Sequence, residues 1–148
     1  MSALQIVLRW MHIVPAVVAG GTTVFSALAL LPAVGTLPES QRPAFREAVM
    51  SRWRVVVMIC IGLLLASGLA NFFLYQAPAH RGQPLYHALF GVKFLLAMNV
   101  FFLASALTGR SPALERIRVN ARYWTAVNAG LVLAILLISG VLRFIPQS

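Results

Sequence analysis

Acidic side chains are almost absent from this chain of 148 residues, which has three Asp or Glu residues against twelve Lys or Arg. The three are Glu39, Glu47 and Glu115, and all of them fall outside the long apolar segments. A di-iron site in a helical bundle needs several buried glutamates, and a membrane proton relay needs intramembrane carboxylates. The shortage argues against both kinds of site, and it leaves no Ser–His–Asp triad.

Cysteine is equally scarce, because Cys60 is the only one in the sequence. A single cysteine excludes an internal disulfide. It lies in the middle of an apolar run, where a small, weakly polar side chain is expected to serve as a packing residue.

Charge as a whole is scarce, and apolar residues take its place. The chain is 10% charged and 60% hydrophobic, with a mean hydropathy of +0.85. A soluble domain has roughly 45–50% apolar and about 25% charged residues. A chain of this size cannot hide so much apolar surface in one small core, so we expect the bilayer to be its solvent.

Four apolar segments are long enough to cross a membrane, which takes about 20 residues. Each must be a helix, because backbone groups in lipid have to be paired within their own segment. The length of the first segment indicates a tilted span rather than a signal peptide. We expect one all-α transmembrane domain over residues 1–148, with helices at about 4–31, 55–75, 85–107 and 124–142.

Arginine distribution predicts how these helices are oriented. We call the side that holds the N-terminus side A and the opposite side, which holds the loops 33–54 and 108–123, side B. Side B then has eight arginines and side A has three, namely Arg9, Arg81 and Arg143. The positive-inside rule places side B in the cytoplasm and both termini outside. Anionic lipid headgroups are the expected partners of the side-B arginines, and nucleic acid is not.

The connections between the spans are short. Loops 33–54 and 108–123 are expected to contain interfacial basic helices, at residues 43–50 and after a Ser111–Pro112 start. Residues 76–84 contain two prolines and a glycine and are expected to form a turn. Short connections make neighbouring helices antiparallel, so the prediction is an up-down-up-down four-helix bundle in the inner (cytoplasmic) membrane.

Two histidines fall inside the predicted spans. His12 lies about two turns into the first segment and His87 about one turn into the third. These two segments run in the same direction and occupy diagonal corners of the bundle, roughly 11–14 Å apart if neighbouring axes are 8–10 Å apart. Two imidazoles that converge across this gap could hold one haem iron near side A. Hydrogen bonding at the interface is the simpler alternative for each of them.

Further polar residues could support such a site. Lys93 is deep in the third segment without an acid in reach, so it snorkels, stays neutral, or pairs with an external acid from a haem propionate, a substrate or a partner subunit. Arg9 and Arg81 could bind the same anion. Asn71 could orient an imidazole or hold helices together. The third histidine, His80, is expected to be a solvated turn residue.

A stripe of small residues follows His12 at helical spacing. It would let a flat porphyrin or a neighbouring helix approach closely, and helix packing is the commoner use. Its members are Ala16, Ala19, Gly20, Thr23 and Ala27.

Two stretches resemble a known superfamily. The sequence LRWMHIVPAVVAGG looks like the first helix of the CopD-like and HemJ-like four-helix membrane proteins, and YHALFGVKFLLAMNVFF resembles their lysine-bearing third helix. The HemJ-like members are protoporphyrinogen oxidases that bind haem b, and the CopD-like members are associated with copper passage. The resemblance implies that His12 is the ligand histidine and Lys93 the family lysine.

These observations lead to one main functional hypothesis and several alternatives. We expect a membrane b-type haem protein with metal ligands His12 and His87, which transfers electrons, with quinol as a candidate donor. The main alternative is a non-catalytic accessory subunit of a larger membrane complex or a homo-oligomer. Porphyrinogen oxidation and copper passage remain further alternatives, so whether the protein is an enzyme stays open.

Overall fold

The computed structural model describes residues 2–146, and within that range it contains helices and no strand. Four continuous helical stretches are long and apolar enough to cross a membrane: Ala3–Val34, Arg42–Ala79, Pro84–Thr108 and Ala121–Phe144. The prediction of an all-helical fold with four helices that could cross a membrane is confirmed.

The first stretch consists of α1 (Ala3–Phe25), η1 (Ser26–Leu30) and α2 (Leu31–Val34). It begins with a capping box, in which the Ser2 hydroxyl accepts from the Gln5 backbone and the Gln5 side chain accepts from the Ser2 backbone. The first helix was predicted to end at about residue 31, and the helical stretch continues past Pro32 to Val34. Proline cannot donate to the preceding turn and clashes with it, and the π-helical η1 directly before Pro32 takes up this disturbance.

The second stretch also has a π-helical segment shortly before a proline. It consists of α3 (Arg42–Asn71), η2 (Phe72–Gln76) and α4 (Ala77–Ala79), and the π-helical η2 again precedes a proline, Pro78. The stretch starts earlier than the predicted residue 55, because residues 43–50 form the first turns of α3 and not a separate interfacial helix. The following turn is correspondingly short, and it includes Gly82 at a φ of 75°.

The remaining elements are α5 (Pro84–Thr108), η3 (Pro112–Leu114), α6 (Glu115–Val119) and α7 (Ala121–Phe144). Proline occupies the first turn of α3, α5 and η3, where its missing N–H costs nothing. A short helix in the loop 108–123 was predicted and is present, although the Ser111 hydroxyl makes no capping hydrogen bond.

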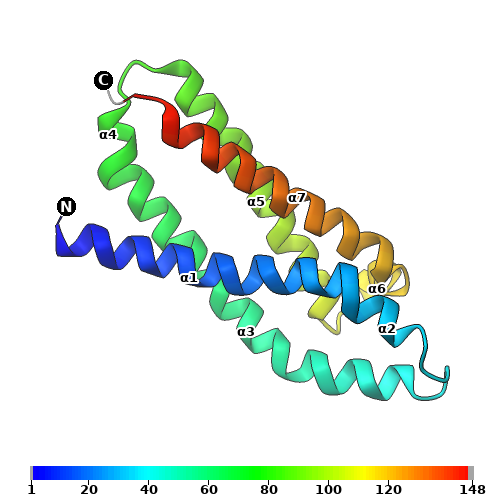
Figure 1. Ribbon diagram of the computed structural model, residues 1–148. Helices are drawn as coiled ribbons and strands as arrows, with labels where there is room; N and C mark the ends of the chain where they lie inside the picture. Colours follow the sequence, from blue (N-terminus) through cyan, green and yellow to red (C-terminus); the bar gives the residue numbers. More distant parts are fainter. Residues whose placement is uncertain (1, 147–148) are drawn as a thin grey trace.

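The long helices form two tightly packed pairs, α1 with α3 and α5 with α7, which touch each other less extensively through α3–α5 and α1–α7. Figure 1 shows α1 crossing α3, whereas α5 and α7 run side by side. Both termini lie toward one end of the molecule, which we call the side-A end, and the loop at residues 35–41 and α6 lie toward the other, the side-B end (Figure 1). Fully buried apolar residues are few, and Cys60 is one of them, as expected.

Candidate functional site

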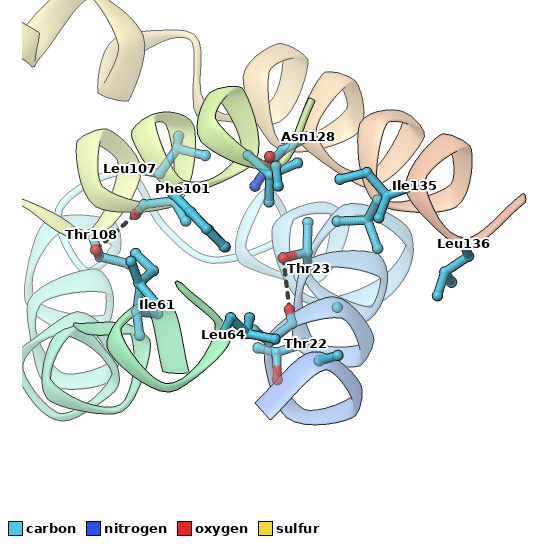
Figure 2. A pocket seen from close by; sticks show the side chains of 18 of the residues that line it. Thr22, Thr23, Ile61, Leu64, Phe101, Leu107, Thr108, Asn128, Ile135 and Leu136 are labelled. Atoms are coloured by element: carbon cyan, nitrogen blue, oxygen red, sulfur yellow. Dashed lines mark hydrogen bonds between the residues drawn. The ribbon is translucent and has the colours of Figure 1, made fainter. Parts of the chain in front are cut away.

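A large cavity separates the two helix pairs. Its volume is about 1530 Å³, and all four long helices contribute to its wall. This exceeds the roughly 300–1,000 Å³ typical of small-molecule sites. Figure 2 shows part of the wall, where Leu64, Phe101 and Ile135 face the hollow together with Thr23 and Asn128. An apolar space of this size inside the bundle can take a large, flat or long-chain ligand.

His12 of α1 lines this cavity and has a fixed orientation. Its Nδ1 lies 3.0 Å from Oγ of Ser67 on α3, and that hydroxyl lies 2.5 Å from the carbonyl oxygen of Leu63. A hydroxyl has one proton, which Ser67 donates to Leu63, so the His12 ring donates from Nδ1. The lone pair of Nε2 is therefore available to a ligand, as in metal-binding histidines whose other nitrogen is held by the protein.

Gly68 gives the imidazole room. A Cβ atom at this position would lie 3.1 Å from Cε1 of His12, which is closer than most Cβ atoms approach a neighbour, and at an ordinary contact distance of 3.5 Å from Nδ1. The neighbouring Ser67 is completely buried. Ser67 and Gly68 together form a seat on α3 for the His12 ring, and this seat fixes both its position and its tautomer.

Lys93 of α5 lies near His12 of α1. Each residue is nine positions beyond the start of its helix, counted from Ala3 in α1 and from Pro84 in α5. Lys93 lines the cavity and is close enough to His12 for their charges to interact. Among residues 2–146 the ion pairs are Arg42–Glu39 and Arg110–Glu47, so the Lys93 ammonium has no acidic partner there. This part of the cavity therefore attracts an anion.

His87 occupies a different environment. It is only three residues beyond Pro84, about 9 Å nearer to the side-A end of α5 than Lys93 at 1.5 Å per residue. Its Nε2 lies 3.1 Å from the carbonyl oxygen of His80, and its ring makes edge contacts with Phe72 and Tyr86. His87 is not among the residues that line the cavity. The structure thus does not bring His12 and His87 to one cavity wall.

The prediction that His80 is solvated was wrong, because this residue is only 3% exposed. Its ring stacks on Tyr86 with centroids 3.7 Å apart, and its Nδ1 lies 2.8 Å from Oε1 of Gln83. Tyr86 in turn donates its hydroxyl proton to the Gln76 side chain. Packing of the turn against α5 buries His80, and a turn-rich sequence alone does not reveal such packing.

The other predicted site residues fall into two groups. Arg9 and Asn71 line the cavity, as does most of the small-residue stripe on α1. Gly20 of that stripe also lets α7 approach, since a Cβ there would lie 3.2 Å from Val132. Arg81 is exposed and lies outside the cavity wall. The stripe therefore serves both of the uses that its spacing allows.

The residues present fit a haem that His12 would hold through one ring nitrogen. A neutral imidazole with a free Nε2 is a common haem ligand, and the unpaired cation Lys93 can hold a carboxylate. The described residues 2–146 contain no group of three or more His, Cys, Asp or Glu that could hold a bare metal ion. A cofactor that brings its own equatorial ligands suits this site better than a free cation does.

Three residues of the site carried no signal that sequence reasoning used. Ser67 and Gly68 matter only because α3 packs on α1 at the level of His12. Asn128 on α7 is 2% exposed and lines the cavity, and its side-chain oxygen has no hydrogen-bond partner in the described part of the chain. A buried unpaired amide is costly, so Asn128 is a candidate contact for a ligand.

No protein-family model, no curated protein and no solved structure matches this chain. The resemblance to the CopD-like and HemJ-like proteins therefore stays a prediction, and the functional argument depends on the geometry of the cavity.

Proposed function

We propose that the chain crosses the cytoplasmic membrane as an up-down-up-down bundle, with both termini outside and the arginine-rich connections in the cytoplasm. The placement of arginines supports this orientation, since residues 35–54 and 109–122 contain eight of the eleven. In this orientation His12 and Lys93 lie in the outer half of the membrane, and the side-B arginines face anionic headgroups.

We further propose that the cavity binds one haem b, which His12 would hold through Nε2. The observation that carries this proposal is the hydrogen bond from His12 to the buried Ser67, which turns the other ring nitrogen into a free donor atom. Lys93 would hold a propionate, and Arg9 at the cavity wall would hold the second. The apolar side chains of all four helices would exclude water from the macrocycle.

Electron transfer is the function that this arrangement supports best. Bound haem b supplies one-electron chemistry at its iron. The one acid on the cavity wall, Glu47, is paired with Arg110 toward side B, so it is not placed to act as a general base beside His12. The residues named here bind and orient the cofactor, and a membrane quinol is a suitable electron donor because it shares the apolar phase.

Haemin titration of the purified protein tests the proposal. We expect wild type to develop a Soret band at a stoichiometry of one, and His12→Ala to lose it. His87→Ala is the matched control, because this histidine is also on a membrane-spanning helix but bonds to the His80 carbonyl outside the cavity. A band that survives His12→Ala would contradict the proposal, and one lost in both variants would restore the paired-histidine hypothesis.

A second candidate function is that of an accessory subunit in a larger membrane complex. In the most apolar part of Ala3–Val34, and likewise in that of Pro84–Thr108, only 6% is buried within the described chain. The two helix pairs therefore leave wide apolar surfaces that a protein partner could cover as well as lipid. Colourless protein that co-purifies with larger subunits, and that binds no haemin, would favour this function over the first.

A further inference from the structure

The side-B mouth of the cavity is strongly basic. Six arginines line the wall there, and the one acid on the wall, Glu47, is paired with Arg110. The six are Arg42, Arg46, Arg54, Arg110, Arg118 and Arg122. A wall with this balance of charge attracts anions into the cavity and is not only a surface facing a membrane.

Most of these guanidinium groups are held by backbone carbonyls. Arg46 donates to the carbonyls of Arg118 and Leu107, and Arg54 donates to that of Thr108. Arg118 donates one Nη to the Ser111 carbonyl at 2.6 Å, whereas its other Nη is buried and has no hydrogen-bond partner among residues 2–146. The mouth thus presents fixed, planar donors, of which at least one still needs an acceptor.

A polar track leads from this mouth into the apolar interior. Arg122, Thr125 and Asn128 follow one another at three-residue spacing along α7, and all three line the cavity. Thr125 and Asn128 are 7% and 2% exposed, and the Asn128 side-chain oxygen lacks a donor. Beyond them the wall is apolar, with Phe101, Leu64 and Ile135 facing the hollow (Figure 2).

From these independent observations we infer a second site, at which the cavity takes the phosphate headgroup of an amphiphile from the side-B leaflet. The phosphate binds Arg118 and Arg122, because guanidinium groups match phosphate oxygens in pairs. A hydroxyl or other donor near the headgroup meets Asn128, and the acyl chain lies in the apolar space. This inference does not depend on haem binding near His12, because it rests on the opposite end of the cavity.

Native mass spectrometry of the detergent-solubilised protein tests it, with phosphatidic acid and phosphatidylcholine of identical chains as probes. We expect wild type to retain one phosphatidic acid at about tenfold lower lipid concentration than phosphatidylcholine. The double variant Arg118→Gln/Arg122→Gln should lose that preference. Arg52→Gln/Arg116→Gln is the control, because it removes the same charge from two exposed arginines outside the cavity wall and should keep the preference.

Two further variants and two further measurements make the result decisive. Arg122→Gln alone and Asn128→Leu should each weaken retention severalfold while thermal melting shows a folded protein. Equal loss in both double variants would overturn the site, since general attraction would then explain the binding. Displacement of the lipid by millimolar inorganic phosphate would contradict the proposal that the ligand is an amphiphile, and would indicate that the arginines bind a soluble phosphate.

A Soret band that is unchanged in Arg118→Gln/Arg122→Gln would confirm that the phosphate site and the haem site are separable.

Discussion

The two ends of the cavity use polar side chains in opposite ways. Near the side-A end, one hydrogen bond to Ser67 fixes His12 and leaves its Nε2 free. Near the side-B end, Arg46 and Arg54 donate hydrogen bonds to carbonyls in the last turn of α5. The last carbonyls of a helix have no partner within the helix itself. The comparison teaches that the number of charged residues does not by itself locate a ligand site. Arg46 and Arg54 pair with backbone carbonyls, whereas His12 keeps its Nε2 free and one Nη of Arg118 has no partner among residues 2–146.

If this contrast is correct, crowding the seat of His12 should have the largest effect. Gly68→Val should weaken haemin binding about 100-fold, because overpacking a tight contact costs about 1–3 kcal/mol and 1.4 kcal/mol is tenfold. Gly62→Val is the control, since a Cβ at Gly62 meets nothing within 4 Å. Haemin titration monitored at the Soret band measures both, and equal affinities would contradict the role of Gly68.

Loss of the orienting hydrogen bond should have the next largest effect. Ser67→Ala leaves the His12 ring in place but removes the acceptor for Nδ1–H. Such partners are typically worth about 10–100-fold in metal affinity, so we expect haemin affinity to fall by about 30-fold. Ser67→Thr keeps the hydroxyl and should retain most of the affinity. An unchanged affinity in Ser67→Ala would show that the ring needs no orientation by α3.

Removal of the unpaired cation should have a smaller effect on the same site. Lys93→Gln should weaken haemin binding by about tenfold, as expected for one charge-assisted hydrogen bond of about 1.5 kcal/mol. Lys93→Arg keeps the charge and should bind within about twofold of wild type. The discriminating ligand is a haemin dimethyl ester, which lacks free carboxylates. Wild type and Lys93→Gln should bind the ester equally. A difference in affinity would show that Lys93 does not act by binding a haem carboxylate.

Substitution of an arginine at the side-B end should have the smallest effect on haemin binding, but it should measurably lower the free energy of unfolding. Arg54→Met leaves the Thr108 carbonyl without its donor and should lower the free energy of unfolding by about 1.5 kcal/mol. Arg52→Met, at an exposed position, should change it by less than about 0.5 kcal/mol. Thermal unfolding in detergent compares the two. Haemin affinity should stay constant in both, and a loss of haemin in Arg54→Met would erase the contrast.

The sequence predicted the helices better than their ends. Long apolar runs require helices in lipid, so four spans follow from hydropathy alone. The start of α3 was missed because residues 42–54 alternate charged and apolar side chains, which is not typical of a membrane-spanning helix. In the structure Arg46 and Arg54 of this segment donate hydrogen bonds to the carbonyls of Arg118 and Thr108. The helix before Pro32 was predicted too short, because the π-helical adjustment that accommodates proline has no simple sequence pattern.

The candidate site was only half predictable. His12 and Lys93 are rare polar residues in apolar runs, and this rarity alone marks them. Ser67 and Gly68 are ordinary residues in a membrane helix, and only the crossing of α1 over α3 gives them a role. The pairing of His12 with His87 was based on similar depth, whereas in the structure Lys93 lies near His12 and His87 does not line the cavity.

Chemical rescue of His12→Gly tests the central claim most directly. This variant removes the imidazole and leaves the Ser67 and Gly68 seat empty, so that free imidazole can enter. We predict that haemin gives no Soret band with the variant alone, and that millimolar imidazole restores the band and its one-to-one stoichiometry. A band that forms without imidazole, or one that imidazole fails to restore in folded protein, would contradict ligation by His12.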